Sequence, residues 1–371
     1  MNVIICGGGT VGHLTPGISI AEIITRADKN SRILFVGREG GEENSVIEKR
    51  GFKLKTIKIS GISRSLSLKN LKSLSNIISS GKRARKIVKE EKPDLVIGTG
   101  GYVCWPIIRA AQKEKIPTMI HESNILPGLA TKLLSPKCDK VLLNFKQSDI
   151  YFKRKDNLMT VGNPLPKAFE TVTREEARRK LGLSKSDFFI LSFGGSTGAQ
   201  RLNESIISLM ESYSVKRKSV KHLHGCGKRY FEEIKEKYPQ FAKGKDGCKI
   251  VPFIDEMATY MKAADTVISR CGAMTLSEIC ACKTVPILIP SPNVTANHQY
   301  KNAKVFTDSG AALMIEESEL NDRTILDAVR YLESNPALRE KMKKRLSTFR
   351  SDEVEKLILK ALNEIIKKPS F

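Results

Sequence analysis

The same order of local features occurs in both halves of the chain: a short apolar run, a glycine-rich loop and a helix. Residues 3–6 open into a loop from Gly7 to His13, and residues 189–193 open into a loop at 194–199. Apolar runs of this length, bounded by glycine, are typical of buried strands, and glycines let the backbone approach a ligand closely. Alternation of such strands with helices predicts α/β domains with parallel sheets.

Further strands are predicted in both halves, so the chain holds more than one sheet. At 371 residues it is longer than one hydrophobic core usually serves. We therefore predict two Rossmann-like, doubly wound domains that face each other across a cleft, at residues 1–162 and 163–344. Glycine and proline at 162–166 suit a linker. The predicted strands lie at residues 32–36, 53–59, 94–98, 116–120, 140–143, 158–161, 220–224, 249–251, 266–269 and 285–289.

The stretch at 266–278, TVISRCGAMTLSE, has the most specific chemistry. Its first four residues suit a strand, Gly272 suits a tight turn, and Thr275 suits the N-cap of a helix. A helix N-terminus above a strand offers N–H groups and a positive dipole to an anion. Glu278 is then placed to accept hydrogen bonds from ribose hydroxyls. Alternatively, Thr275 and Glu278 form a capping box that only satisfies the helix itself.

The sequence of the first glycine loop is compatible with more than one kind of ligand. Gly7, Gly9 and Gly12 match the dinucleotide fingerprint, which keeps an NAD(P) oxidoreductase as an alternative. The next strand, however, ends in Gly37-Arg38-Glu39 instead of placing an acid at its tip, and a Walker lysine is missing. The loop is predicted to face a phosphate or a sugar, or to be structural.

The chain is strongly basic, with 63 Lys and Arg against 40 Asp and Glu, a formal net charge of +23. Residues 49–92 concentrate this charge, and residues 66–91 predict a basic amphipathic segment. Such a block suits an anionic membrane surface or nucleic acid. Phe52 is its only aromatic residue, so base stacking has little support and we expect no nucleic-acid partner.

Cysteine spacing and apolar runs bear on the compartment. The eight cysteines show no Cys-x-x-Cys pair, which indicates a reducing cytosol and not a disulfide framework or zinc site. No signal peptide is expected, and the apolar runs are far shorter than the roughly 18 residues of a spanning helix. Membrane contact is therefore expected to be peripheral. No Asp-x-Asp occurs, so we expect no tightly bound cofactor, although a divalent cation can assist through the substrate.

Seven short motifs follow one another along the chain: Gly12-His13, Gly100-Gly101-Tyr102, His121-Glu122-x-Asn124, Gly162-Asn163-Pro164, Gly194-Gly195-Ser196, Phe253-Ile254-Asp255-x-Met257, and Arg270-x-Gly272-Ala273-x-Thr275-x-Ser277-Glu278. In this order they resemble the peptidoglycan glycosyltransferase family. Its members add N-acetylglucosamine from UDP-N-acetylglucosamine to undecaprenyl-diphosphate-linked N-acetylmuramyl-pentapeptide, on the inner face of the bacterial membrane.

The resemblance covers nearly the whole chain and implies a fold of the glycosyltransferase B type. The second domain would hold the donor nucleotide, the first would hold the lipid acceptor, and a C-terminal helix at about 345–371 would return to the first domain. It also implies a peripheral location on the cytoplasmic face of the membrane, with other cell-wall enzymes as possible partners. Another UDP-sugar glycosyltransferase with a lipid acceptor is the nearest alternative.

The resemblance also implies the site. Thr10, Gly12 and Asn124 would lie near the donor sugar and diphosphate. Ser196 would contact phosphate, the Ile254 backbone would meet uracil, and Gln299 would bind sugar hydroxyls. Val11 and His298 stand where the family has glycine and glutamine, and Cys271 replaces a serine. The predicted substrate-binding residues are Thr10, Val11, Gly12, Asn124, Ser196, Ile254, Arg270, Gly272, Ala273, Met274, Thr275, Leu276, Ser277, Glu278, His298 and Gln299.

An inverting transfer needs a general base, because the acceptor hydroxyl loses its proton as it attacks the anomeric carbon. His13 is the first candidate, since an imidazole titrates near neutrality and leaves the first glycine loop at the start of a helix. Glu122 is the second candidate, because it ends a predicted strand beside His121. Alternatively, His13 only shapes its loop or contacts diphosphate.

Overall fold

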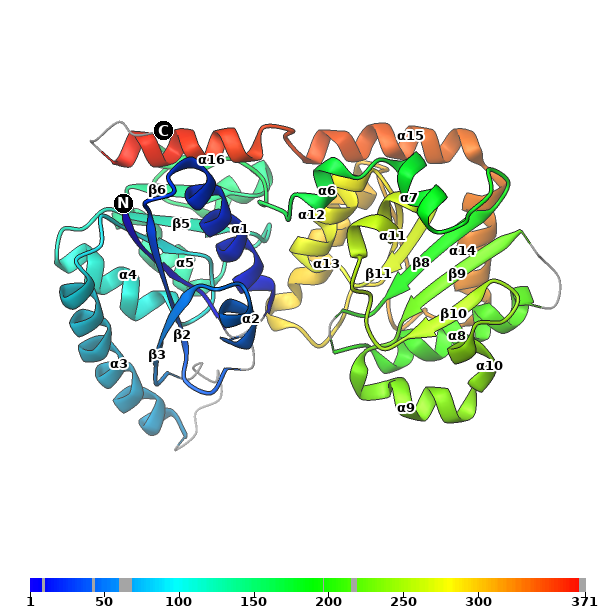
Figure 1. Ribbon diagram of the computed structural model, residues 1–371, viewed down its shortest axis with the longest axis horizontal. Helices are drawn as coiled ribbons and strands as arrows, with labels where there is room; N and C mark the ends of the chain where they lie inside the picture. The colour runs from blue at the N-terminus through cyan, green and yellow to red at the C-terminus, as the bar shows by residue number, and fades with distance from the viewer. Residues whose placement is uncertain (9–10, 42–43, 60–68, 196, 215–218, 367–371) are drawn as a thin grey trace. The chain divides into compact units, whose positions relative to one another are not determined.

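The chain forms two compact units (Figure 1). A computed structural model describes residues 1–8, 11–41, 44–59, 69–195, 197–214 and 219–366, without the side chains of residues 11, 69–78, 214 and 295. The N-terminal unit comprises Met1–Leu165 with Ser351–Phe371, and the C-terminal unit comprises Pro166–Arg350. These boundaries lie a few residues beyond the predicted ones at 162 and 344. The cleft between the units stays a prediction.

The N-terminal unit is built on a seven-stranded parallel sheet in the order β3-β2-β1-β4-β5-β6-β7. Its strands are β1 (Asn2–Cys6), β2 (Arg32–Arg38), β3 (Lys53–Ile57), β4 (Leu95–Gly98), β5 (Thr118–Glu122), β6 (Lys140–Leu143) and β7 (Leu158–Thr160). Its described helices are α1 (Val11–Ala27), α2 (Asn44–Lys49), α3 (Lys69–Glu91), α4 (Cys104–Lys113), α5 (Leu129–Leu134), η1 (Ser135–Lys137), η2 (Lys146–Tyr151) and α16 (Val354–Ile365).

Helices cover both faces of this sheet, because successive apolar side chains of each strand point to opposite faces. In β1, Val3 and Ile5 pack with side chains of α1, α2 and α16, whereas Ile4 and Cys6 pack with those of α3 and α4. Because successive side chains of a strand point to opposite faces, an apolar strand needs helices on both sides. The predicted doubly wound architecture is confirmed for this unit.

The C-terminal helix α16 packs in the N-terminal unit, beside α1 and β6 (Figure 1). Its buried residues Val354, Ile358, Ala361 and Leu362 recur at helical spacing and join the core that contains α1. Two ion pairs lie at its margins, Arg26–Glu355 at 2.8 Å and Lys140–Glu364 at 2.6 Å.

The C-terminal unit repeats the plan on a six-stranded parallel sheet in the order β10-β9-β8-β11-β12-β13. Its strands are β8 (Phe188–Phe193), β9 (Val220–Gly225), β10 (Cys248–Val251), β11 (Thr266–Ser269), β12 (Val285–Leu288) and β13 (Leu313–Met314). Its described helices are α6 (Ala168–Thr171), α7 (Arg174–Lys180), α8 (Gln200–Ser214), α9 (Lys228–Lys237), α10 (Pro239–Lys243), α11 (Met257–Ala263), α12 (Ala273–Cys282), η3 (Thr295–Asn297), α13 (His298–Asp308), α14 (Asp322–Ser334), α15 (Pro336–Leu346) and η4 (Ser347–Phe349).

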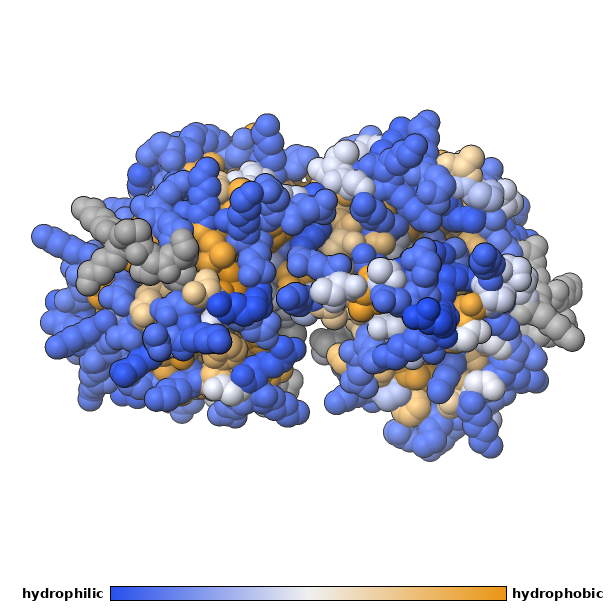
Figure 2. Space-filling view, turned by 45° about the horizontal axis from the view of Figure 1, so that its top comes forward, coloured by the Kyte–Doolittle hydropathy of each residue, from blue (hydrophilic) through white to orange (hydrophobic). Residues whose placement is uncertain are grey.

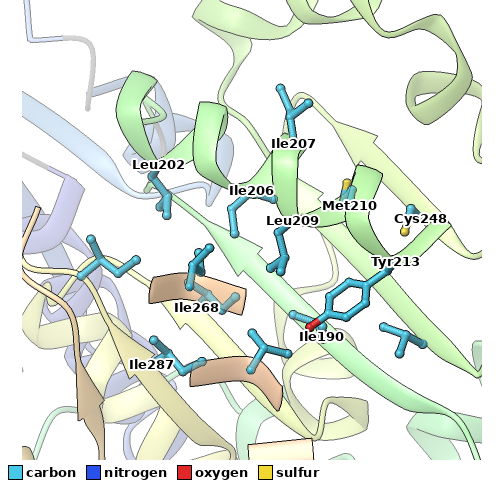
Figure 3. Close-up of a cluster of buried hydrophobic side chains, with 14 of the residues drawn as sticks. Ile190, Leu202, Ile206, Ile207, Leu209, Met210, Tyr213, Cys248, Ile268 and Ile287 are labelled. Atoms are coloured by element: carbon cyan, nitrogen blue, oxygen red, sulfur yellow. The ribbon is translucent and has the colours of Figure 1, made fainter. Parts of the chain in front are cut away.

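One face of this sheet packs on α8. Figure 3 shows Leu202, Ile206 and Leu209 of that helix beside Ile190, Ile268 and Ile287 of three neighbouring strands. These side chains are all fully or almost fully buried. The recurrence of apolar residues at positions three and four apart explains why α8 lies along the sheet.

The surface is predominantly hydrophilic on the face drawn in Figure 2, with smaller hydrophobic areas between the polar side chains. All eight cysteines are buried and carry free thiols. Among the described residues, no helix has the length and apolar character needed to cross a membrane.

Three features differ from what the sequence suggests. Proline suits the first turn of a helix, but α1 begins at Val11, so Pro16 lies inside it. Strand β5 runs over Thr118–Glu122, so His121 and Glu122 belong to the strand end. The short strand β13 was not predicted, because two residues carry no periodic signal.

Candidate functional site

In each sheet the order of strands reverses beside the first strand of the unit. Strand β1 lies between β2 and β4, and β8 lies between β9 and β11. Ligands of open α/β sheets bind at this switch point, outside the carboxyl ends of the strands. The loops after β1 and β4, and those after β8 and β11, therefore define the candidate site of each unit.

His13 lies at the switch point of the N-terminal unit, in the first turn of α1. Its ring lies against the turn Gly100-Gly101 that follows β4. A Cβ atom at Gly100 would stand 2.7 Å from His13 Cδ2 and 3.3 Å from Nε2. Both glycines have positive φ, 109° and 81°. Only glycine fits this turn, since a side chain would be strained and would displace the imidazole.

Glu122 is buried, and both of its carboxylate oxygens are engaged. Oε1 accepts from the Asn124 N–H at 3.0 Å and from Asn124 Nδ2 at 3.3 Å, and Oε2 accepts from the Gly128 N–H at 3.0 Å. These bonds hold the loop between β5 and α5. They suit a carboxylate that shapes this loop and holds the Asn124 side chain, more than one that accepts a proton from substrate.

His121 is fully buried, and its Nε2 lies 3.0 Å from the Gly162 carbonyl oxygen. Burial lowers the pKa of His121 to about 4, more than the hydrogen bond to Gly162 raises it. The residue therefore ties β5 to the segment after β7 as a neutral imidazole.

The first glycine loop is described only in part. Thr10 lies outside the described residues, as does the Val11 side chain, whereas Gly12 is exposed near the start of α1. Ser196 of the second glycine loop also lies outside them.

In the C-terminal unit, α12 begins earlier than predicted. Its N-cap is Gly272, with extended backbone and no side-chain cap bond, and its first helical bond runs from the Leu276 N–H to the Gly272 carbonyl at 3.0 Å. The prediction that Thr275 is the N-cap is wrong, and so is the capping box, because Glu278 lies more than a turn inside the helix. Gly272 provides the cap because it lies at the end of the loop after β11.

Glu278 is partly buried, and its side-chain carboxyl makes no hydrogen bond or ion pair with any described residue. Burial raises the pKa of its carboxyl to about 8. Leu276 and Ser277, by contrast, point into the unit: both are buried, and Ser277 Oγ donates to the Ala273 carbonyl at 3.1 Å. Ala273 is buried, while Met274 and Thr275 are half-buried.

Gln299 and Arg270 hold the loops around α12. Gln299 Oε1 accepts from the N–H groups of Cys271 (3.2 Å) and Ser291 (2.9 Å), so its amide joins the loops after β11 and β12. The Arg270 guanidinium donates to the Ile289 carbonyl at 3.2 Å and forms an ion pair with Glu317. Arg270 thus stabilises the edge of the site. His298 begins α13 and is half-buried.

Ile254 follows β10 and is buried against the end of β9. A Cβ at Gly225 would stand 3.0 Å from Ile254 Cδ1, so the glycine makes room for this side chain. Ile254 therefore lies beside the carboxyl ends of β9 and β10, and its contact with uracil stays a prediction.

A buried polar network lies beneath the second glycine loop, and sequence reasoning missed it. Ser192 Oγ lies 2.7 Å from His222 Nε2 and 2.8 Å from His224 Nδ1, and His224 Nε2 lies 3.1 Å from Asn203 Oδ1. Asn203 Nδ2 donates to the Cys226 carbonyl at 3.0 Å. The spacing His-x-His was the available signal, because alternate residues of a strand share a face.

Both histidines of this network are held neutral. Burial lowers the pKa of His224 to about 4. Burial, and then the neighbouring His224, hold the pKa of His222 well below its usual value. The network therefore carries hydrogen bonds without a charge.

Within the described parts of the chain, no group of three or more His, Cys, Asp or Glu side chains is arranged to hold a metal ion.

Two family models match the chain. The Glycosyltransferase family 28 N-terminal domain matches residues 3–143, and the Glycosyltransferase family 28 C-terminal domain matches residues 189–358. These matches include the switch-point loops of both units.

Similar curated proteins carry one name, UDP-N-acetylglucosamine--N-acetylmuramyl-(pentapeptide) pyrophosphoryl-undecaprenol N-acetylglucosamine transferase. The one from Caldanaerobacter subterraneus subsp. tengcongensis is 40% identical over 350 residues, which are 94% of this chain and 95% of that protein. The one from Acetivibrio thermocellus is 37% identical over 99% of each chain.

Solved structures share the fold. A crystal structure of Acinetobacter baumannii MurG superposes with a TM-score of 0.77 at 24% identity and covers 99% of each chain. A structure of S. aureus MnaA with UDP has a TM-score of 0.69 at 15% identity and covers 100% of this chain and 99% of that one.

Proposed function

The chain belongs to the family of the UDP-N-acetylglucosamine--N-acetylmuramyl-(pentapeptide) pyrophosphoryl-undecaprenol N-acetylglucosamine transferases, and on this premise we propose that it catalyses that transfer with inversion at the anomeric carbon. The observation that carries the proposal is 40% identity over 94% of the chain, together with family models whose matched residues include both switch-point sites. The two doubly wound units are of the glycosyltransferase B type. The family assignment replaces the NAD(P) oxidoreductase alternative.

The C-terminal unit is the proposed donor site. The N-terminus of α12 offers N–H groups and the positive end of its dipole to the diphosphate. Glu278 has no other partner among the described residues and would accept hydrogen bonds from the ribose. Gln299 holds its oxygen on two backbone N–H groups, which leaves its Nε2 to donate to sugar hydroxyls.

In the proposed reaction, the acceptor hydroxyl oxygen bonds to the anomeric carbon while the bond from that carbon to the diphosphate breaks. The hydroxyl proton passes to the His13 imidazole, and UDP leaves. The N-terminus of α12 stabilises the negative charge that develops on the leaving diphosphate. Glu122 shapes the loop that carries Asn124 and takes no proton.

Replacing Glu278 by glutamine is expected to raise the KM for UDP-N-acetylglucosamine about tenfold or more. Above pH 8, where the Glu278 carboxyl is ionised, a charge-assisted hydrogen bond is worth roughly 1.5–3 kcal/mol, and the amide removes that charge while it keeps the side-chain shape. Steady-state kinetics check the change, with exposed Glu319→Gln of the same unit as the control. An unchanged KM with a lowered melting temperature would give Glu278 a structural role only.

Titration with NADH, expected to show no binding, tests the oxidoreductase alternative directly.

We also propose that the N-terminal unit docks on the anionic cytoplasmic surface of the membrane. Leu129, Leu133 and Ile150 expose 70%, 56% and 72% of their area. Their elements, α5 and η2, meet where Lys132 Nζ stands 4.9 Å from the Tyr151 ring. Exposed leucine and isoleucine among lysines suit the interface of an anionic bilayer. Partner enzymes of cell-wall synthesis stay a prediction.

The basic segment predicted for docking is described in part. Its apolar residues between 66 and 78 lie outside the described side chains, and Lys82, Arg83, Arg85 and Lys86 are exposed on α3. Two of these four have acidic partners, since Arg85 pairs with Glu114 and Lys86 with Glu90. The α5–η2 surface, defined by Leu129, Leu133 and Ile150, is therefore the sharper target.

Changing Leu129, Leu133 and Ile150 together to serine is expected to weaken binding to anionic phospholipid vesicles at least about tenfold. Burying one such side chain contributes about 1.5–3 kcal/mol. Partial insertion of three side chains therefore contributes more than the roughly 1.4 kcal/mol that corresponds to a tenfold change in binding. Vesicle sedimentation at fixed salt measures the change. Tyr331→Ser, an exposed aromatic of the C-terminal unit, is the matched control. Unchanged binding of the triple variant would exclude this surface.

A further inference from the structure

The end of β1 and the turn after β4 are locked together by one carbonyl group. The Cys6 carbonyl oxygen lies 2.9 Å from the Thr99 N–H donor, 3.4 Å from Thr99 Oγ1 and 3.1 Å from Cys104 Sγ. Cys104 is the first residue of α4 and is 3% exposed. Its thiol thus reaches the C-terminal end of β1, at the strand that leads to His13.

The same sulfur holds Gly100. Cys104 Sγ accepts from the Gly100 N–H at 3.3 Å and lies 3.0 Å from the Gly100 carbonyl oxygen. A thiol has one proton, which it gives to one of the two carbonyls, while a sulfur lone pair accepts the Gly100 N–H. Cys104 therefore joins the turn after β4 to the end of β1.

This turn is the surface against which His13 lies. The Gly100 backbone is so close to the ring that a Cβ there would stand 2.7 Å from His13 Cδ2, and a Cβ at Gly101 would stand 3.3 Å from Nδ1. A turn of two glycines has no side chains of its own to fix it. Groups outside the turn must hold it, and Cys104 makes the side-chain contacts to Gly100 that the structure describes.

We propose that Cys104 is a positioning residue for the transfer reaction: it holds the Gly100-Gly101 turn where that turn sets the orientation of the His13 imidazole. The proposal rests on the proposed function, in which His13 accepts the proton of the acceptor hydroxyl. Cys104 touches no substrate and acts through His13.

Cys104→Val tests this role, because valine is similar in size and can neither donate nor accept a hydrogen bond. Its kcat is expected to fall about 10- to 100-fold, since a small misplacement of a catalytic group has costs of this order. The KM for UDP-N-acetylglucosamine is expected to stay unchanged, because the donor site is in the other unit. Cys104→Ser, which restores a donor and an acceptor, is expected to recover most of the activity.

Cys138→Val is the matched control. Cys138 is fully buried in the same apolar cluster as Cys104, but it precedes β6 at the opposite end of the sheet from the glycine turns. Its kcat is expected to match the wild type. If Cys104→Val does not fold, Cys104→Ala removes the sulfur with less steric change and provides the same comparison.

The deciding measurement is a double-mutant cycle with His13→Ala. If Cys104 acts through His13, adding Cys104→Val to His13→Ala causes no further loss of kcat. An equal loss in both backgrounds, or wild-type kcat in Cys104→Val, overturns the positioning role. If the wild-type chain transfers no N-acetylglucosamine at all, the proposed function fails instead, so the two failures are distinct.

Discussion

His13→Ala is expected to lower kcat for N-acetylglucosamine transfer by about 10²- to 10⁴-fold, the usual contribution of a general base. His13 lies in the first turn of α1 at the switch point of its sheet, with its ring against the Gly100-Gly101 turn. The other imidazole of this site, His121, is fully buried on the Gly162 carbonyl, and burial lowers its pKa to about 4. His13 is therefore the histidine of this unit placed to take a proton from substrate.

The measurement is steady-state turnover with both substrates saturating, together with the affinity for UDP-N-acetylglucosamine. That affinity is expected to change little, because the proposed nucleotide contacts lie in the C-terminal unit. Retention of more than roughly a tenth of wild-type turnover, well above the loss expected for a base, would remove His13 from the role. Glu122 would not replace it easily, since both of its oxygens hold the loop between β5 and α5.

The C-terminal unit is expected to lose stability as the pH falls from about 6.5 to 4, because it buries two neutral histidines. Unfolded histidine has a pKa near 6.5, whereas in the folded unit the pKa of His224 is about 4 and that of His222 is held well below its usual value. Below pH 6.5 the unfolded chain binds protons that the folded unit does not. Each histidine then removes about 1.4 kcal/mol of stability per pH unit, or about 2.7 kcal/mol for the pair.

Glu278 opposes this loss. Its folded pKa of about 8 lies above the unfolded value, so its charged form destabilises the fold, and this penalty is relieved as the pH falls from about 8 toward 4.5. Subtracting the Glu278 contribution of about 1.4 from about 2.7 leaves an expected wild-type slope of about 1.4 kcal/mol per pH unit, whereas Glu278→Gln is expected to approach about 2.7 kcal/mol per pH unit. Urea unfolding between pH 6 and 4.5, read by hydrogen exchange in β8 and β9, measures both slopes. Stability that is independent of pH in this range would contradict the buried neutral pair.

The strands and their alternation with helices were predictable, because buried parallel strands are continuous apolar runs. Residues 140–143 and 266–269 coincide with β6 and β11. The start of α12 was not predictable from capping residues alone. Thr275 is a strong N-cap type, but the chain already turns at Gly272, and a glycine cap carries a weak sequence signal.

The hydrogen-bond partners of these side chains could not be predicted from the sequence, for a different physical reason. Glu122 and His121 end a strand, which predicts a place at the ligand edge of the sheet but not which atoms they bind. In the structure, both carboxylate oxygens of Glu122 accept hydrogen bonds from a loop up to six residues away, and His121 forms a hydrogen bond with the Gly162 carbonyl. Cys104 likewise contacts Cys6, 98 positions earlier in the chain. Such contacts depend on tertiary packing and leave no periodic pattern.

The most direct test of the account is the transfer itself. Purified chain, undecaprenyl-diphosphate-linked N-acetylmuramyl-pentapeptide in detergent and UDP-N-acetylglucosamine with a labelled sugar are expected to yield a labelled lipid-linked disaccharide and an equal amount of UDP. The new glycosidic bond is expected to have the anomeric configuration opposite to that of the donor. Absence of labelled lipid product, or transfer from a different UDP-sugar in preference to UDP-N-acetylglucosamine, would contradict the account.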